Sequence, residues 1–369
     1  MVLAIIGAGE AALPIIAKAR EMSVKTLAFA RLGSAAQDTV DYFIEENFFD
    51  VDYMAKVCRE YSVDGVMATS ELTTEAAAKL AAKLGLPGND ITNGFAGKNK
   101  YVMRERAKLL ESVRQPKYFL YKGRNLLSYP VVVKAVDSCG KRGVGIARND
   151  KEFADRVRIA ADYSTNGEVL VEEYLKGGKE YSIECLSYKG LHQIIQYTEK
   201  DSSGPPHFIE TGHHQPADLS PGLKDKVGKA TSDILSALGL DCGMAHLELK
   251  IIDGEIYFIE VGARAGGDHI ADTLVGLSTD FDYYRAAIEC SLNTYSYQNA
   301  HTVAYSGIYF HCKQNEQLAD LFKKAEDAEW CVHNTVKDST FFEVDSNLGT
   351  SASGFFIYRS NHRITLLDK

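Results

Sequence analysis

The sequence predicts a mixed α/β and α+β protein, in which a parallel-sheet unit is followed by two units with antiparallel strands. Three observations predict this fold class. Over roughly the first ninety residues, short apolar runs alternate with helix-like stretches, which is typical of a parallel sheet covered by helices. After Pro116, a strand leads into a glycine-bearing loop. Beyond residue 180, paired strands are joined by short turns, and one of these turns is Asp253-Gly254, a pair that favours a tight hairpin.

The first unit begins with an apolar strand at residues 2–6, which Gly7-Ala8-Gly9 closes. A helix at 11–22 and a second strand at 26–30 complete a β-α-β pattern. The pattern continues with a helix at 51–61, a strand at 65–68 and a helix at 73–84. We expect this unit to end near residues 87–93.

The second and third units have a different character. We expect a helix at 99–110, strands at 129–134 and 168–173, and a helix at 151–162 between them. The third unit is expected to contain a hairpin of strands 181–188 and 192–197, a loop rich in Gly, Pro and His at 201–221, a helix at 223–238, and a second hairpin of strands 245–252 and 255–261. Helix, strand and turn segments fill residues 281–369.

Composition and charge exclude several classes of protein. The chain has 369 residues, is 45% hydrophobic and 25% charged, and carries a formal net charge of -9. An acidic chain without clustered Lys and Arg is not suited to nucleic acid. The seven cysteines are scattered and never form a Cys-x-x-Cys pair, which favours a reducing cytoplasm. No apolar run reaches the roughly 18 residues that a membrane span needs, and no signal peptide is expected.

The loop at residues 138–145 is a candidate phosphate-binding loop. Glycines allow the backbone to approach a ligand closely, so that several N–H groups can point at an anion. Lys134 lies on the preceding strand, and Lys141 and Arg142 lie within the loop. The loop lacks the Gly-Lys-Ser/Thr of a Walker A motif. A glycine-rich hairpin turn with solvated basic residues explains the same pattern equally well.

The strand that ends near residue 173 offers a candidate nucleotide edge. Glu172, Glu173, Tyr174 and Leu175 follow an apolar run, and backbone groups at such a strand end can pair with the edge of adenine. Glu180 could accept hydrogen bonds from ribose hydroxyls, as acidic residues do at other nucleotide sites. Acidic residues at strand ends are also common without any ligand.

Two carboxylates on the second hairpin form a stronger signal. If Asp253-Gly254 closes that hairpin, residues whose numbers add up to about 507 face each other, so Glu248 and Glu260 are near cross-strand neighbours. Opposed carboxylates repel each other unless a cation or a proton lies between them. Magnesium prefers carboxylate and phosphate oxygens, so the pair suits a metal–nucleotide site. The alternative is two solvated acids on an exposed strand.

Two further segments are candidates for substrate binding. Arg264 lies between glycine-bearing stretches directly after Glu260, and its planar fork matches a carboxylate or a phosphoryl group. His213 and His214 are adjacent. Side chains of neighbouring residues on an extended segment point in opposite directions, so both cannot easily serve one metal ion, and a substrate-contacting loop is the preferred interpretation. Surface histidines are the alternative.

Taken in order, these motifs resemble the ATP-grasp superfamily. The resemblance is strong over about residues 100–268, and the first ninety-odd residues are similar to the family's Rossmann-like pre-ATP-grasp domain. Within the superfamily, Gly212-His-His-Gln-Pro-Ala217 and Ala263-Arg-Ala-Gly-Gly-Asp268 look most like the carboxylate–amine ligases that join amino acids (L-amino acid ligases). The resemblance implies a pre-ATP-grasp domain at 1–95, a linker helix and small lid subdomain at 96–180 (lid about 116–174), and a large subdomain with a C-terminal extension at 181–369.

The resemblance also implies roles for individual residues. Arg264 and Glu260 would be catalytic, Glu248 and Glu260 would hold Mg²⁺ (or Mn²⁺), and Arg264 would also meet the activated carboxyl group. The ATP-binding residues would be Lys100, Lys134, Ser138, Cys139, Gly140, Gly143, Val144, Glu172, Glu173, Tyr174, Leu175 and Glu180. The substrate-binding residues would be His213, His214, Arg264, Gly267 and Asp268. One departure is Gly262, which stands where many members have an Asn that ligates metal.

The implied reaction is phosphoryl transfer from ATP to a carboxylate, followed by attack of an amine on the acyl phosphate. The partners would be small molecules, namely carboxylate and amine substrates of amino-acid type, and a homodimer is possible. The pocket would be formed by the His213 segment, the residues after Arg264, and Glu71. A carboxylase or formyl-transferring enzyme of nucleotide metabolism is one alternative, and a nonenzymatic nucleotide sensor is another, supported only by Gly262.

An NADP-dependent oxidoreductase is the alternative from a different class. The stretch Gly7-Ala-Gly-Glu-Ala-Ala12 follows a strand and opens a helix, much as a dinucleotide-binding fingerprint does, and Arg31 ends the second strand. No catalytic set of a dehydrogenase follows downstream in the sequence.

Overall fold

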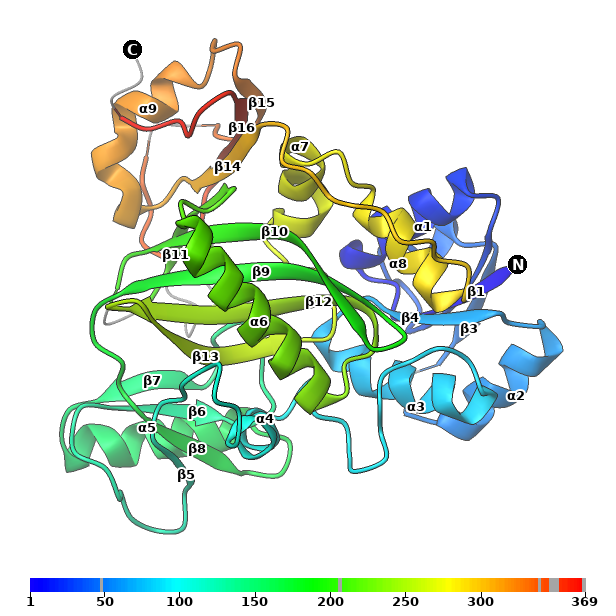
Figure 1. Cartoon of the computed structure of the whole chain (residues 1–369), viewed down its shortest axis with the longest axis horizontal. Coiled ribbons are helices and arrows are strands. Elements are labelled where there is room, and N and C mark those ends of the chain that lie inside the picture. The colour runs from blue at the N-terminus through cyan, green and yellow to red at the C-terminus, as the bar shows by residue number, and fades with distance from the viewer. Residues whose placement is uncertain (47–48, 205–207, 338–339, 345–351, 367–369) are drawn as a thin grey trace.

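The computed structural model describes residues 1–46, 49–204, 208–337, 340–344 and 352–366. Three β-sheets organise the chain (Figure 1). A parallel sheet is built from the N-terminal residues, a small antiparallel sheet from the middle of the chain, and a large antiparallel sheet from the remainder. The mixed α/β and α+β class predicted from the sequence is confirmed.

The N-terminal sheet has four parallel strands in the order β3-β2-β1-β4. Its strands are β1 (Val2–Ile6), β2 (Lys25–Ala30), β3 (Tyr42–Glu45) and β4 (Gly65–Ala68), and its helices are α1 (Leu13–Glu21), α2 (Val51–Glu60) and α3 (Thr74–Leu84). Short 3₁₀ turns lie at Glu10–Ala12, Gln37–Thr39 and Glu71–Thr73. Alternate residues of β1 are buried on opposite faces, one face against α2 and α3 and the other against α1. The parallel arrangement requires this cover on both faces.

A linker helix leads into the small sheet. The helix is α4 (Lys100–Ala107), and its first turn is capped by the Asn99 side chain, which accepts hydrogen bonds from the Tyr101 and Val102 N–H groups. The small sheet has the order β5-β8-β6-β7 and packs against one helix. Its elements are β5 (Tyr118–Leu120), β6 (Val131–Ala135), β7 (Val144–Ala147), α5 (Asp150–Tyr163) and β8 (Val169–Glu173).

The large sheet has eight antiparallel strands in the order β13-β12-β9-β10-β11-β14-β16-β15. The strands are β9 (Lys179–Tyr188), β10 (Leu191–Ser202), β11 (Glu210–Gln215), β12 (Cys242–Ile252), β13 (Glu255–Gly262), β14 (Tyr305–Phe310), β15 (Cys331–Asn334) and β16 (Phe355–Ser360). The helices of this region are α6 (Pro221–Leu238), a π-helical turn at Ile270–Leu274, α7 (Val275–Ser278), α8 (Tyr283–Ser291), a 3₁₀ segment at Lys313–Leu318 and α9 (Ala319–Lys324). Figure 1 shows α6 lying across the sheet and the small sheet next to the β13 side.

The two faces of the large sheet differ sharply in polarity. On β9, Tyr181, Ile183 and Cys185 point to one face, where they pack with α6 in an apolar cluster. Because side chains alternate along a strand, the intervening Glu180, Ser182 and Glu184 point to the other face. One face therefore forms core, and the opposite face gathers polar groups.

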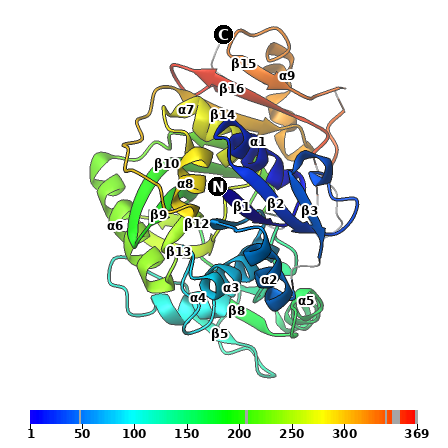
Figure 2. The same ribbon diagram turned by 90° about the vertical axis from the view of Figure 1, so that its right-hand side faces the viewer.

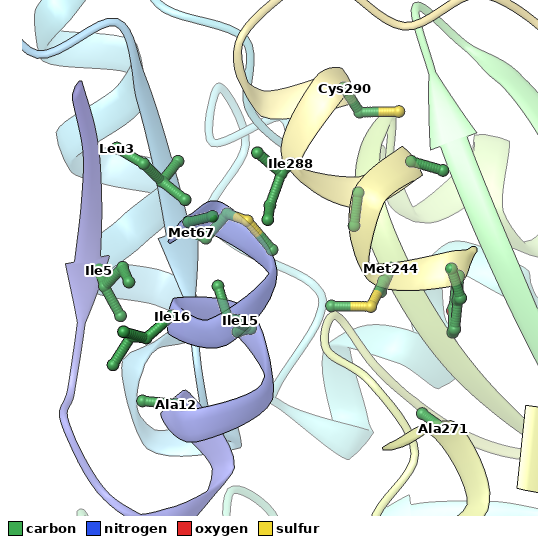
Figure 3. Packing of buried hydrophobic residues seen from close by; sticks show 14 of the residues in the cluster. Leu3, Ile5, Ala12, Ile15, Ile16, Met67, Met244, Ala271, Ile288 and Cys290 are labelled. Carbon is green, nitrogen blue, oxygen red and sulfur yellow. The ribbon is translucent and has the colours of Figure 1, made fainter. Parts of the chain in front are cut away.

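Helix α8 joins the N-terminal unit to the large sheet. Figure 2 shows α8 between the N-terminal unit and the large sheet, and α8 contacts α1 and β4 on one side and β9 and β12 on the other. Figure 3 shows Ile288 and Cys290 of α8 in the same cluster as Ile15 of α1 and Met67 of β4, with Met244 of β12 at the other side of the helix. One continuous apolar cluster thus fixes the two units to each other.

Most of the predicted elements are confirmed to within a few residues, and the main error concerns residues 201–221. The predicted loop contains strand β11, which is buried between β10 and β14. Its sequence, Glu-Thr-Gly-His-His-Gln, shows no alternation of apolar and polar residues and contains no Val or Ile. The strand therefore depends on its two neighbours rather than on its own strand propensity. Residues 205–207 of that predicted loop lie outside the described residues. The proposed domain boundaries at 95 and 180 remain a prediction.

Candidate functional site

The polar face of the large sheet is the candidate site. Strand register places polar residues of four strands next to one another, because Glu180 pairs with Lys200 and Lys250, Ser182 with Glu248, and Glu248 with Glu260. Several of these side chains are buried although they can be charged: Glu184 is fully buried, Lys200 is 7% exposed and His246 is 6% exposed. Burying so many ionisable groups is costly unless they are paired, and all three of them form ion pairs.

A β-bulge places Glu248 and Glu260 on the same face. From Ile252 and Glu255 up to Leu249 and Phe258, the hairpin keeps the register that the Asp253-Gly254 turn sets. Between Leu249 and Glu248 the register shifts by one, so Ile259 is the extra residue on β13 and Glu248 lies directly opposite Glu260. Without the bulge, Glu260 would point to the apolar face, because a slip of one residue reverses every side chain.

A lysine lies against each of these carboxylates. Lys100 Nζ is 3.3 Å from Glu260 Oε2, and Lys200 Nζ is 2.6 Å from Glu248 Oε1. Burial alone would raise the pKa of Glu248, but Lys200 outweighs burial and holds that pKa well below its ordinary value. Burial would likewise lower the pKa of Lys200, but Glu210 and Glu248 hold it well above its ordinary value. Both side chains are therefore charged near neutral pH.

The residues fit a magnesium ion with a polyphosphate. Two opposed carboxylates supply the oxygen ligands that Mg²⁺ prefers, and the flanking lysines could neutralise phosphate oxygens. Ser182, between the two carboxylate strands and β10, has a buried hydroxyl without a hydrogen-bond partner among the described residues. The predicted pairing of Glu248 with Glu260 is thus present in the structure.

Glu172 lies near the end of β8 and forms ion pairs with two basic side chains. Arg104 Nε donates to Glu172 Oε1 at 2.6 Å, and Lys134 Nζ lies 2.7 Å from Glu172 Oε2. Burial would raise the pKa of Glu172, but Arg104 and Lys134 lower it to about 2. The Glu172 carboxylate is therefore fully engaged by Arg104 and Lys134.

The glycine-bearing loop joins β6 to β7 and contacts the large sheet. The Ser138 carbonyl accepts a 2.6 Å hydrogen bond from Lys100 Nζ, which ties the loop to α4. Gly143 has φ +70°, and a Cβ there would lie 2.9 Å from Tyr163 Cβ, so packing explains this glycine. Gly140, with φ +62°, has open space around it. Lys141 Nζ reaches Glu210 Oε1 on β11 at 2.8 Å.

The remaining predicted nucleotide residues lie in the glycine-bearing loop, on β7, at the end of β8 and at the start of β9. Cys139 Sγ accepts a 3.1 Å contact from Arg142 Nη2, and Glu173 accepts from the Lys117 N–H. Glu180 lies on the polar face, 3.6 Å from Lys250 Nζ. Val144 begins β7, Tyr174 packs its ring 6.3 Å from that of Phe208, and Leu175 is partly buried.

Arg264 lies at the boundary with the N-terminal unit. Its Nη2 is 3.2 Å from Glu71 Oε2, on the 3₁₀ turn after β4. Burial raises the pKa of Glu71, although Arg264 opposes this effect. Gly262, two residues after Glu260, lies beside Arg264: a Cβ at Gly262 would be 3.4 Å from the guanidinium, close to ordinary van der Waals contact.

A buried carboxylate–imidazole pair supports the Arg264 segment. Glu184 Oε1 is 2.5 Å from His246 Nδ1, and Glu184 Oε2 accepts a 3.1 Å hydrogen bond from the Gly266 N–H. The other ring nitrogen of His246 is 3.4 Å from Glu248 Oε1. A Cβ at Gly266 would lie 2.7 Å from His246 Nδ1, so only glycine fits here. The pair joins the segment after Arg264 to a candidate metal ligand.

The two adjacent histidines lie on opposite faces of β11. His213 pairs with Lys200 on the polar face, and its Nε2 is 3.1 Å from Glu210 Oε2. Its ring is fully buried, and neither nitrogen has a hydrogen bond of good geometry among the described residues. Ligand atoms of Glu210, His213 and the exposed Asp268 lie within 4.8 Å of one another. The neighbouring Gly267 is exposed.

His214 is held on the other face by structural contacts. Its Nδ1 is 3.0 Å from the Tyr358 hydroxyl and its Nε2 is 3.0 Å from Asp201 Oδ2. Burial lowers the pKa of His214, against the opposing effect of Asp201. Of the two predicted histidines, His213 is therefore the one that lies with the other candidate site residues.

Sequence reasoning missed four residues of this site: Arg104, Glu184, Lys200 and Glu210. Glu184 had a usable signal, since Glu180, Ser182 and Glu184 alternate with apolar residues on a strand and must share a face. Lys200 and Glu210 depend on the pairing of β10 with β11, a strand that the sequence did not reveal. Arg104 is one of several basic residues on α4, and nothing in the sequence separates it from its solvated neighbours.

Residues 127–272 match the family model described as "ATP-grasp domain". This stretch, less than half of the chain, is similar to an ATP-grasp domain. The match includes Lys134, the glycine-bearing loop, the acids at the end of β8 (Glu172 and Glu173), Glu248, Glu260 and Arg264. The motif order that suggested the ATP-grasp resemblance is confirmed by this match.

Known relatives and solved structures agree with this assignment. The carbamoyl phosphate synthase large chain of Ralstonia nicotianae is 29% identical over 170 residues, which are 44% of this chain and 15% of that protein. The chain thus spans a small part of the length of the curated relatives it matches. The L-amino acid ligase from Bacillus licheniformis has a TM-score of 0.79 at 23% identity, with 98% of this chain and 93% of that chain covered.

A third comparison concerns the biotin carboxylase domain of 2-oxoglutarate carboxylase from Hydrogenobacter thermophilus, crystallised with ADP, its magnesium salt and bicarbonate. Its TM-score is 0.70 at 17% identity, with 98% of this chain and 86% of that chain covered. At these identities the structural likeness establishes the fold. The predicted resemblance to the ATP-grasp fold is confirmed, whereas the ligase activity with ATP and magnesium stays a proposal for this chain. In the described part of the chain, no helix has the length and apolar character that crossing a membrane requires.

Proposed function

We propose that this protein is an ATP-dependent ligase that activates a carboxylate as an acyl phosphate and couples it to an amine, with amino acids as substrates. The observation that carries the proposal is the bulged hairpin that turns Glu248 and Glu260 to one face, with Lys100 and Lys200 against them. Opposed carboxylates flanked by lysines suit a metal-bound polyphosphate. The likeness to the L-amino acid ligase fold supports the substrate class.

The nucleotide would lie between the small sheet and the polar face of the large sheet. Lys100 and Lys134 would contact phosphates, and the backbone of residues 138–144 would cover them. The backbone at Tyr174 and Leu175 would pair with adenine, and Glu180 would bind ribose. Glu248 and Glu260 would hold magnesium, which when bound supplies charge stabilisation at the transferred phosphoryl group. This arrangement is supported by the convergence of α4, β6, β8, β12 and β13 on one region.

The substrates would occupy the side of the site that faces the N-terminal unit. Arg264 would bind the carboxylate and orient it toward the phosphoryl group, because its fork matches both anions. Glu71, which already pairs with Arg264, would fix the arginine in place. Glu210 and Asp268 place two carboxylates beside His213, with ligand atoms within 4.8 Å of one another, and these carboxylates suit the ammonium group of an amino acid. Gly267 would leave room for that substrate.

The chemistry then has two steps. A carboxylate oxygen attacks the γ-phosphorus of ATP, the bond to the bridging oxygen of ADP breaks, and an acyl phosphate forms. The amine then attacks the acyl carbon, phosphate leaves, and the amide retains one N–H after losing a proton. Contacts such as Lys141 with Glu210 would hold the glycine-bearing loop over the site and exclude water from the acyl phosphate.

A phosphate-release screen of amino acids, singly and in pairs, tests the proposal. We expect phosphate and ADP only when a suitable carboxylate and a suitable amine are both present, and no release from Glu260→Gln. Mass spectrometry of the product should show the amide. A folded protein that binds no nucleotide in the presence of magnesium would contradict the proposal.

A carboxylase is a second candidate, favoured by the likeness to a carboxylase domain that was crystallised with bicarbonate. In that case ADP release would depend on added bicarbonate and not on an amine. Repeating the screen in buffer freed of carbon dioxide, with and without bicarbonate, separates the two candidates. The expected homodimer and the cytoplasmic location remain predictions.

A further inference from the structure

Arg104 connects three separate parts of the molecule, although it lies in none of the sequence motifs. It is fully buried on α4. Its Nε donates to the Glu172 carboxylate of the small sheet at 2.6 Å, and its Nη2 donates to the Ile259 carbonyl of the large sheet at 2.6 Å. Its guanidinium also lies 5.2 Å from the centre of the Phe258 ring.

The contact with Ile259 falls at the bulge. Ile259 is the extra residue on β13, at the point where the register shift turns Glu260 toward Glu248. Its carbonyl accepts a hydrogen bond from the buried Arg104 side chain, and this charge-assisted hydrogen bond at the extra residue stabilises the bulged conformation. The orientation of Glu260 therefore depends on a residue of the linker helix.

The contact with Glu172 determines what Lys134 can do. Glu172 is neutralised by two cations, Arg104 on one carboxylate oxygen and Lys134 on the other. If Lys134 turns to a phosphate, Arg104 still compensates the buried carboxylate. Without Arg104, Lys134 would be the sole counter-charge of Glu172, and moving it would leave a buried charge unpaired.

We propose that Arg104 is a positioning residue for nucleotide and metal binding: it frees Lys134 to bind phosphate, and it holds the bulge that turns Glu260 toward Glu248. This inference rests on the proposed function. Lysine cannot replace arginine here. The hydrogen bonds to Glu172 of the small sheet and to the Ile259 carbonyl of the large sheet come from different nitrogens of one planar guanidinium group. The inference assigns Arg104 no contact with substrate.

The test is calorimetric binding of ADP to the full chain at several magnesium concentrations, for wild type, Arg104→Met and Arg104→Lys. Arg106→Met is the matched control, because Arg106 lies on the same helix and also donates to backbone carbonyls, at Leu238, Asn93 and Gly94. In Arg104→Met we expect ADP affinity to fall at least roughly tenfold, since a charge-assisted hydrogen bond of the kind lost contributes that much. In Arg106→Met we expect ADP affinity close to that of wild type.

Arg104→Lys keeps the positive charge near Glu172 and loses the hydrogen bond to Ile259. It therefore separates the compensation of Glu172 from the stabilisation of the bulge, and it provides a test even if Arg104→Met does not fold. We expect it to bind ADP without magnesium as wild type does, while the magnesium concentration for half-maximal enhancement rises several-fold. Hydrogen exchange at β13 amides should be faster in this variant than in Arg106→Met. If wild type binds ADP and Arg104→Lys has the same magnesium requirement and the same β13 exchange rates as wild type, the role of Arg104 is overturned. If wild type binds no ADP in the presence of magnesium, the proposed function itself is overturned.

Discussion

The buried carboxylate of Glu172 provides a quantitative prediction about stability. Its side chain is 3% exposed and lies between Arg104 and Lys134. Arg104 and Lys134 overcome the effect of burial and lower the pKa of Glu172 from 4.5 to about 2. At ~1.4 kcal/mol per pKa unit, this difference corresponds to roughly 3 kcal/mol of folding free energy at neutral pH.

The pH dependence of this contribution to stability follows from the direction in which the pKa of Glu172 is shifted. A carboxyl group whose pKa is lower in the folded state contributes its full stabilisation above pH 4.5 and loses it as the pH falls toward 2. Replacing Glu172 with Gln removes that contribution and leaves two buried cations without a counter-charge, at a cost of about 3–5 kcal/mol. Glu172→Gln should therefore be destabilised at pH 7 and should show a weaker loss of stability between pH 5 and pH 3 than wild type.

The assay is urea unfolding at pH 7, 5, 4 and 3, with hydrogen exchange of the β6 and β8 amides as a local readout. Glu173→Gln is the matched control, because Glu173 is the next carboxylate on the same strand and is partly exposed, with the Lys117 N–H as a partner. We expect Glu173→Gln to follow wild type. Equal urea midpoints and equal pH dependence for Glu172→Gln and Glu173→Gln would refute the reasoning.

Three further predictions concern the candidate site. Gly266→Ala should lower thermal stability by about 1–3 kcal/mol because its Cβ would overlap the buried carboxylate–imidazole pair. Gly267→Ala, with nothing within 4 Å of its Cβ, should keep the melting temperature of wild type, and equal melting temperatures for the two variants would contradict this prediction. His214→Phe should lose about 1–3 kcal/mol of stability with the substrate KM unchanged, whereas His213→Phe should keep its stability and raise the KM. The KM is measured by phosphate release with the substrates found in the screen, and the reverse pattern would show that His214 rather than His213 contacts substrate. Glu248→Gln should raise the magnesium concentration needed for half-maximal phosphate release, and an unchanged magnesium requirement would exclude Glu248 as a ligand.

The sequence predicted the elements whose patterns are local. The parallel unit was visible because each strand and helix has its own periodicity, and the facing of Glu248 with Glu260 followed from one turn, Asp253-Gly254. The bulge that corrects the register by one residue could not be predicted, since it depends on the partner of the Ile259 carbonyl on a helix 155 positions away in the chain.

The parts that sequence reasoning missed depend on pairing between distant segments. Strand β11 forms only because β10 and β14 flank it, so its two histidines could not be assigned to faces beforehand. Arg104 looks like any basic residue of an exposed helix until the small sheet and the large sheet are both in place. Buried ion pairs of this kind carry no sequence pattern of their own.

Helix α8 has a consequence for the order in which the chain can become structured. It is encoded more than two hundred residues after β4, yet its Ile288 and Cys290 complete the apolar cluster on one side of the N-terminal sheet. While the chain is being synthesised from its N-terminus, the apolar surface of α1 and β4 that α8 covers stays exposed until α8 has emerged. A fragment cut at residue 95 would carry the same uncovered apolar surface. We therefore expect a fragment of residues 1–95 to aggregate on expression, and its solubility to be restored when α8 is supplied through a short polar linker.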